Sequence, residues 1–275
     1  MKRLSTLFLL LSVSATAHSD GSPWLLPDGS YNVNISVTSG ESDDFFIGDT
    51  STDLGGTLEG TFVWLKATYG YDDVWAFDAR TGYAESTFEN SLADQQDITD
   101  TSFGVSYQFI NEFEADNGLP TISGRLGYTF GGDYDPNQIE ALGDGASGFD
   151  VSFLIGKSLS PGWSVFGDLT FRQRDSGVAD GIKYIAGASY NPPIPYLGFL
   201  LSLAGTRTDS NVNLGEGTFT IDDFSQTDRD SDLIVAGVNL NFPIGIGLGV
   251  SYSALIDGTN QSDTDVITFN LGYSF

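Results

Sequence analysis

The chain has 275 residues, with 37 acidic residues against 11 basic ones and a formal net charge of −26 at pH 7. This charge argues against nucleic-acid binding, which needs basic surface to neutralise phosphates, although it is also typical of proteins from salty habitats. The absence of cysteine excludes disulfides, thiolate metal sites and a lipid anchor on cysteine.

The first 17 residues have the pattern of a cleaved signal peptide. Lys2 and Arg3 precede an apolar run over residues 4–13, and residues 15–17 read Ala-Thr-Ala, the small-x-small form of a cleavage site. The run is too short to span a bilayer, and no later segment approaches the ~20 apolar residues of a membrane helix. We therefore expect export, cleavage after Ala17 and one domain over residues 18–275.

The remainder of the chain is predicted to form strands. Apolar and polar residues alternate with period 2, so that Phe103 and Val105 share one face of a strand while Ser102 and Ser106 share the other. Ten to fourteen strands fit this pattern. We predict twelve, near residues 31–40, 57–71, 74–88, 101–113, 121–131, 149–160, 163–175, 181–191, 197–208, 231–242, 245–256 and 266–275.

The connections between these strands are sorted by length. Short turns rich in Pro, Gly or Asp lie near 71–73, 117–120, 160–162, 191–195 and 243–245. Longer, acidic loops lie near 41–56, 89–100, 132–148, 176–180, 209–230 and 257–265. An even strand number with alternating short turns and long loops is typical of bacterial outer-membrane barrels. The predicted fold class is therefore all-β, a transmembrane antiparallel up-and-down β-barrel of about 12 strands.

A soluble, lipocalin-like barrel is the alternative, because it would turn the same apolar face inward. Aromatic residues favour the membrane barrel, since they gather at the strand ends next to the short turns and resemble a girdle at a bilayer interface. They are Tyr69, Tyr71, Trp75, Trp163 and Tyr273. We expect the protein in the outer membrane of a Gram-negative cell, in contact with lipids and lipopolysaccharide.

The last strand ends on an aromatic residue, Phe275. In this it resembles the closing strand of outer-membrane barrels, whose terminal aromatic residue is read by the barrel-assembly machinery. The resemblance implies that Phe275 is an assembly signal and that this machinery is a partner of the chain.

Charged residues fall on the face that is lumenal under the membrane prediction, because an ionised side chain facing hydrocarbon costs ~2–4 kcal/mol at the midplane. A charged ring selects counter-ions, and arginine forks onto carboxylate or phosphate. Alternatively, acids and bases pair within the lumen, and a plugged structural barrel would have every lumenal arginine paired. The pore-lining candidates are Lys66, Asp78, Arg80, Glu112, Arg125, Asp150, Asp168, Arg172, Arg174 and Lys183.

Seven glycines lie at strand positions that alternate onto the predicted lumenal face. They either leave the lumen open or allow neighbouring strands and plugging loops to approach closely. They are Gly104, Gly127, Gly156, Gly187, Gly237, Gly247 and Gly249.

The sequence contains no motif that indicates catalysis or cofactor binding. The single histidine, His18, lies at the cleavage junction, and no motif provides another base for a nucleophile. We therefore predict that the chain is not an enzyme and needs no cofactor. Asp228, Asp230 and Asp232 offer hard oxygen ligands for Ca²⁺ or Mg²⁺, but the Gly and terminal Glu of an EF-hand are missing, so solvated loop charge is the simpler interpretation.

One resemblance goes beyond architecture. Residues 100–107, 120–133 and 145–157 combine strand, short turn, strand and a Gly-Asp loop in the order found in the outer-membrane transporters grouped with phenol-degradation meta-pathway barrels. The resemblance implies a channel for small, often aromatic or hydrophobic compounds, and it supplies no functional residues. A transporter of hydrophobic solutes would have an apolar pocket near Phe45, Phe46 and Ile47.

Twelve strands lie between the filled eight-stranded barrel and the wide porins of 16 or more. We therefore predict a narrow passive channel or transporter for small molecules, with anionic or hydrophobic solutes. The alternative is a non-conducting structural or surface-interaction barrel whose acidic loops bind cations.

Overall fold

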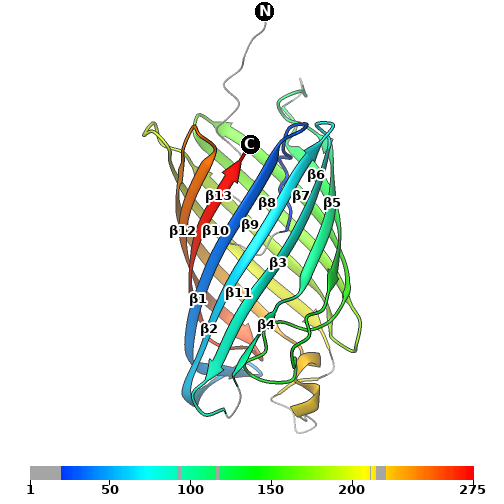
Figure 1. Cartoon of the computed structure of the whole chain (residues 1–275), viewed down its shortest axis with the longest axis vertical. Helices are drawn as coiled ribbons and strands as arrows, with labels where there is room; N and C mark the ends of the chain where they lie inside the picture. The colour runs from blue at the N-terminus through cyan, green and yellow to red at the C-terminus, as the bar shows by residue number, and fades with distance from the viewer. Residues whose placement is uncertain (1–19, 92–93, 116–117, 211, 215–220) are drawn as a thin grey trace, which may run out of the picture.

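The protein is a closed antiparallel β-barrel (Figure 1). The computed structural model describes residues 20–91, 94–115, 118–210, 212–214 and 221–275, so the expected signal peptide lies outside the described residues. Sequential strands pair around the barrel, β1 pairs with β13, and β4 adds a short segment beside β3. The strands are β1 (Tyr31–Ile47), β2 (Thr50–Tyr71), β3 (Trp75–Phe88), β4 (Gln95–Ile98), β5 (Thr101–Ile110), β6 (Thr121–Phe130), β7 (Gly148–Ser160), β8 (Trp163–Arg174), β9 (Asp180–Tyr190), β10 (Leu197–Asp209), β11 (Asp230–Asn241), β12 (Ile246–Thr259) and β13 (Asp265–Ser274).

The twelve predicted strands and the predicted fold class are confirmed, but two predicted loops are wrong. Residues 41–56 mostly continue β1 and β2 as a long hairpin, whose Phe45 is buried against Phe224 of the 3₁₀ helix η1 (Ile221–Gln226) with ring centroids 6.1 Å apart. This apolar anchor comes from a distant part of the chain. Within predicted loop 89–100, β4 pairs with Tyr83–Ser86 of β3, beyond Arg80, where the pairing of β3 with β5 ends.

The seam of the barrel is closed at the end where the short turns lie. The backbone N–H of Tyr31 donates to the carbonyl of Phe275 at 2.8 Å, and the N–H of Phe275 donates to the carbonyl of Tyr31 at 3.0 Å. The two rings stack with centroids 5.2 Å apart. We call this the turn end, and the opposite end, which carries β4 and η1, the loop end (Figure 1). Recognition of Phe275 by the assembly machinery stays a prediction.

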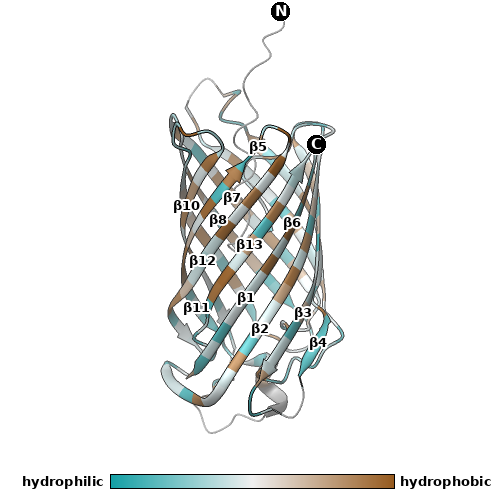
Figure 2. Cartoon of the chain, turned by 60° about the vertical axis from the view of Figure 1, so that its left-hand side comes forward, coloured by the Kyte–Doolittle hydropathy of each residue, from teal (hydrophilic) through white to brown (hydrophobic). Residues whose placement is uncertain are grey.

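The outer face of the barrel is apolar. Phe109, Phe269 and Leu201 are 63%, 60% and 56% exposed, and brown bands alternate with paler ones along β1, β12 and β13 (Figure 2). An apolar surface this extensive is stable against lipid, not water, and it excludes the lipocalin-like arrangement with its apolar face inward. The aromatic residues Tyr71, Trp75, Trp163 and Tyr273 are exposed at the turn end. No helix in the described ranges is long and apolar enough to cross a membrane.

Neighbouring residues of β13 allow the two faces to be compared. Phe269 points outward, whereas Asn270 points to the lumen between Ser36 of β1 and Gly249 of β12. We expect Phe269→Arg to lower the free energy of unfolding in lipid vesicles by ~2–4 kcal/mol, because it places a cation in hydrocarbon. Asn270→Arg is the matched control and should cost much less. Equal losses in urea titrations of the two variants would contradict this orientation.

Candidate functional site in the barrel lumen

Strand register brings the predicted pore-lining residues together inside the barrel. Lys66 lies opposite Arg80, and Asp150 lies opposite Arg172, each on the face turned away from the exposed apolar residues. Arg125, Asp78, Asp168, Arg174 and Lys183 occupy the same inward parity on their strands. Glu112 differs, because β5 ends at Ile110 and Glu112 belongs to the following turn.

The lumen also contains a part of the chain that the sequence analysis did not anticipate. Residues 20–30, here called the N-terminal segment, precede β1: residues 20–26 lie inside the barrel, and the exposed residues 27–29 lie at its turn end beside Asp72 and Asp73. The carbonyl of Pro23 accepts hydrogen bonds from Gln108 Nε2 at 3.0 Å and Ser123 Oγ at 2.7 Å. Trp24 Nε1 donates to Glu112 Oε1 at 3.0 Å. Partners on β5, β6 and the intervening turn therefore hold the segment against one side of the lumen.

Two glycines make room for this segment. A Cβ added at Gly156 would lie 2.6 Å from Cζ2 of Trp24 and 2.8 Å from Cγ of Pro23, which is closer than packed atoms allow. A Cβ at Gly70 would overlap the carbonyl oxygens of Leu26 and Pro27. The lumenal glycines were expected either to leave the lumen open or to let a plugging segment approach closely. Gly156 does the second. The sequence signal that marks this path is small inward residues on β2 and β7.

The innermost described residue of the segment, Asp20, meets the basic residues of the lumen. Its carboxylate accepts a hydrogen bond from Arg80 Nη1 at 2.9 Å, and its carbonyl accepts one from Lys66 Nζ at 2.8 Å. The Arg80 guanidinium lies 3.9 Å from the ring centroid of Trp64, an inward residue of β2. Lys183 makes no hydrogen bond or ion pair with any described residue, yet it acts electrostatically on Asp20.

Arg125 is paired within the barrel wall. It donates from Nε to Asp78 Oδ2 at 2.9 Å and from Nη2 to Asp78 Oδ1 at 2.6 Å, and the two side chains are only 1% and 6% exposed. A Cβ at Gly104 or Gly127 would overlap the guanidinium group. These two inward glycines therefore make room for the ion pair, because they let the Arg125 side chain lie flat against the sheet.

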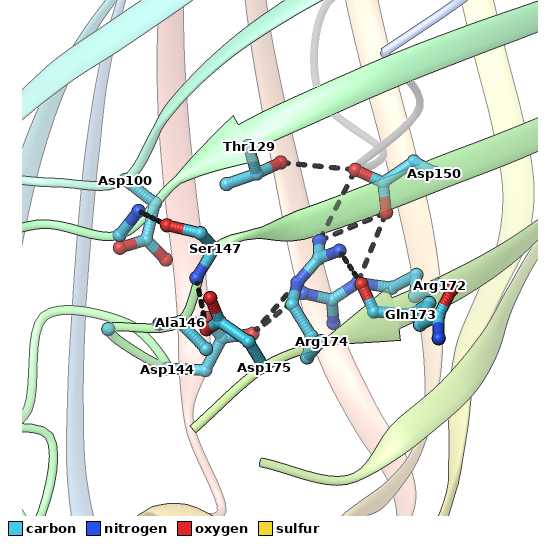
Figure 3. Close-up of polar contacts among 12 residues, drawn as sticks. Asp100, Thr129, Asp144, Ala146, Ser147, Asp150, Arg172, Gln173, Arg174 and Asp175 are labelled. Atoms are coloured by element: carbon cyan, nitrogen blue, oxygen red, sulfur yellow. Dashed lines mark hydrogen bonds and ion pairs between the residues drawn. The ribbon is translucent and has the colours of Figure 1, made fainter. Parts of the chain in front are cut away.

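Towards the loop end, two arginines share two carboxylates (Figure 3). Arg172 Nη2 lies 2.7 Å from Asp144 Oδ2, and Arg174 Nη2 lies 3.0 Å from Asp150 Oδ1. Thr129 Oγ1 also donates to Asp150, at 3.1 Å. On the same strand as the arginines, Asp168 accepts a hydrogen bond from Thr170 Oγ1 at 2.8 Å.

All four lumenal arginines thus have a carboxylate partner, the arrangement expected of a plugged barrel. For Arg125, Arg172 and Arg174 the partners belong to the barrel and its loops. For Arg80 the partner is Asp20, which belongs to the N-terminal segment. The pairing of Arg80 therefore depends on where this segment lies.

The lumen has a second, uncharged side. Along the paired regions of β10–β13 and β1, the inward residues are Gly, Ser, Thr, Asn, Ala, Val and Leu, and we call this surface the neutral wall. The side-chain nitrogen and oxygen of Asn239 and the Oδ1 atoms of Asn241 and Asn270 have no hydrogen-bond partner in the described part of the protein. These amide atoms are buried within the neutral wall.

At the loop end, the carboxyl groups of Asp100 and Asp144 interact with each other outside the spanning strands. Burial and the nearby Asp144 raise the pKa of Asp100, although Tyr134 Oη and Gly132 N–H donate to it at 2.6 Å and 2.9 Å. Burial alone would also raise the pKa of Asp144, but Arg172 and Arg174 outweigh it and lower that pKa.

The aspartates considered for metal binding do not converge. Asp228 accepts from Thr208 Oγ1 at 3.0 Å, Asp230 accepts from the N–H of the same residue at 3.1 Å, and Asp232 pairs with Arg207 Nη2 at 2.7 Å. In the chain as described, no group of three metal-ligating side chains could hold an ion. The apolar residues near 45–47 form no open pocket at Phe45, whose ring is covered by Phe224.

Comparison with known proteins supports the architecture. No protein-family model and no curated protein matches the chain. An outer-membrane channel from Pseudomonas putida F1 has a TM-score of 0.74 at 15% identity, covering 94% of this chain and 99% of that one. KdgM porin has a TM-score of 0.53 at 9% identity, covering 88% and 99%. The translocator domain of autotransporter NalP from Neisseria meningitidis has a TM-score of 0.52 at 13% identity, covering 91% and 90%.

These likenesses show the fold. The chain has the fold of a bacterial outer-membrane β-barrel, as predicted. The resemblance to phenol-degradation meta-pathway barrels, the absence of enzymatic activity and the signal peptide stay predictions.

The Arg125–Asp78 pair should contribute strongly to stability. Asp78→Asn leaves a buried guanidinium without its counter-charge, and we expect the free energy of unfolding to fall by about 3–5 kcal/mol. Asp232→Asn is the matched control, since the Arg207–Asp232 pair is exposed by 41% and 31% and should contribute less than about 1 kcal/mol. A loss of similar size in both variants, measured by urea titration, would mean that the lumen is as well solvated as the surface.

The Asp100–Asp144 pair predicts a pH dependence at the loop end. Because the pKa of Asp100 is raised in the folded state, its stabilising contribution is present at low pH and is lost as the pH rises through that pKa. Hydrogen exchange, corrected for the intrinsic effect of pH, should therefore show residues 131–147 losing protection above about pH 4, by at most about tenfold per pH unit. Asp100→Asn mimics the protonated form and should remove the trend; an unchanged trend would place its origin elsewhere.

Proposed function

We propose that this protein is a narrow passive channel for small polar solutes in the outer membrane, and that the structure is its closed form. The observation that carries the proposal is the composition of the lumen. Charged and polar side chains line much of its wall, and one side is occupied by the N-terminal segment.

The two sides of the lumen have different roles in this proposal. The charged side, formed by β2, β3 and β5–β9, holds the segment through Lys66, Arg80, Gln108 and Ser123. The neutral wall opposite carries amides with no partner in the described part of the protein. A hydrated path between the segment and the neutral wall suits small polar solutes, and displacement of the segment widens it and exposes basic charge.

Exposed basic charge favours anions over hydrophobic solutes. Lys66 and Arg80 both donate to Asp20, so loss of the segment leaves two cations facing the lumen, and a cationic constriction attracts counter-ions. KdgM porin, one of the structural neighbours, has also been solved with oligogalacturonate, and its TM-score here is 0.53. The covered ring of Phe45 gives no support to a hydrophobic solute.

A non-conducting structural barrel is the second candidate. The observation in its favour is that all four lumenal arginines are paired in the described structure. The two functions differ in one respect: a structural barrel needs the N-terminal segment in place permanently, whereas a channel needs it to leave.

Single-channel recording in a planar bilayer separates these candidates. We expect small, discrete openings from the intact protein, and a several-fold larger conductance with anion preference after deletion of residues 20–28, because the deletion clears the charged side of the lumen. Heat-modifiable migration on a gel verifies that the variant is folded. Gly249→Leu, on the neutral wall, is a second test, since it should narrow the path without touching the segment. A folded deletion variant that stays silent would leave the structural barrel.

A further inference from the structure

The site occupied by Asp20 is built from the walls of the barrel. Lys66 of β2 and Arg80 of β3 donate to Asp20 directly, and Arg125 of β6 and Lys183 of β9 add positive charge to the same lumen. Arg125 is already neutralised by Asp78. In the described chain, Arg80 pairs with no carboxylate other than that of Asp20.

The groups at this site are arranged in advance of any ligand. The Arg80 guanidinium lies over the Trp64 ring at 3.9 Å, and a Cβ at Gly82 would lie 2.5 Å from Cε3 of that ring, so the sheet is shaped to receive the indole. Stacking fixes the plane of the guanidinium and leaves its N–H groups directed into the lumen. Lys66 adds a flexible donor on the neighbouring strand.

Asp20 presents two oxygen atoms to this site, one from its carboxylate to Arg80 and one from its backbone carbonyl to Lys66. A free carboxylate also has two acceptor oxygens, and it carries the full negative charge that the site balances. Lys183 lies on the lumenal face of β9 and has no hydrogen-bonded partner among the described groups.

We propose that Lys66, Arg80 and Lys183 form a binding site for a small organic carboxylate, in which Asp20 acts as an internal ligand that a carboxylate solute displaces. The inference rests on the proposed channel function and adds the solute class and the means of opening. A solute that takes the place of Asp20 removes the inner anchor of the N-terminal segment, so arrival of solute is coupled to widening of its own path.

The absence of cysteine from the sequence makes the segment directly observable. Ser22→Cys introduces a single thiol next to Asp20, and its rate of modification by an uncharged hydrophilic maleimide reports exposure of the segment. The assay uses the folded barrel purified from outer membranes, with succinate as the probe. Sodium chloride at equal ionic strength controls for screening, acetamide for the uncharged group, and inorganic phosphate for anion chemistry in general.

We expect succinate to raise the modification rate several-fold and saturably, with chloride and acetamide having little effect. Asp20→Asn in the same background should react fast without succinate and no longer respond. Arg80→Gln removes the partner of the Asp20 carboxylate as well as that of the solute, so it should raise the rate without succinate and leave a smaller succinate response. Lys183→Met, which breaks no hydrogen bond or ion pair in the described structure, should raise the half-saturating succinate concentration, and Arg207→Gln on the outer face should leave it unchanged.

The outcomes distinguish this site from the channel function. A succinate response no larger than that of chloride, or one unchanged in both Arg80→Gln and Lys183→Met, overturns the carboxylate site. A phosphate response equal to that of succinate overturns the carboxylate preference. If the deletion of residues 20–28 conducts while succinate has no effect, the site fails and the channel stands. If succinate raises the modification rate of the Ser22→Cys variant in a barrel that never conducts, the channel fails and the site stands.

Discussion

The structure depends on the requirement that charge inside a barrel surrounded by lipid be neutralised inside that barrel. Away from the strand ends the outer face is apolar and has no place for an ion, so each basic side chain on the inner face of the wall has to meet an acid, water or another polar group in the lumen. Arg125 meets this requirement with Asp78, and Arg172 and Arg174 meet it with Asp144 and Asp150. The same requirement accounts for the inward glycines, since Gly104 and Gly127 provide the flat surface on which the Arg125 guanidinium lies.

Around Arg80 the wall does not meet this requirement by itself. Asp78, the acid nearest along β3, is taken by Arg125 through both of its oxygens. The remaining positive charge draws in Asp20, and the residues between Asp20 and β1 are then held along β5, β6 and β7 by Pro23 and Trp24. A local excess of basic charge in the wall thus holds the inner part of the N-terminal segment, residues 20–26, inside the lumen. Neutral residues at Lys66 and Arg80 would have left the segment without an inner anchor.

Much of this fold could be predicted from the sequence because a barrel strand is specified locally. Alternation along residues 101–110 or 266–275 identifies a strand and its lipid face without reference to any other part of the chain. The hairpin at residues 41–56 could not be predicted in this way, since its polar composition hides the alternation and Phe45 is held by the distant Phe224. The inward placement of the charged residues could also be predicted, because alternation along a strand fixes the inner face once the lipid face is known.

The partners of those charges could not be predicted from the sequence, and the reason is physical. Parity states that Arg80 and Arg125 face the lumen, but it does not state which arginine takes Asp78, because that choice depends on reach across the sheet. The N-terminal segment has no periodicity, and its position follows from charge left over after the wall has paired. A count of inward charges over β2–β9 shows that excess, with six basic residues against Asp78, Asp150 and Asp168 on these strands. An unbalanced lumen of this kind indicates that a mobile anion, from the chain or from solution, belongs to the site, and in this protein the chain itself supplies one.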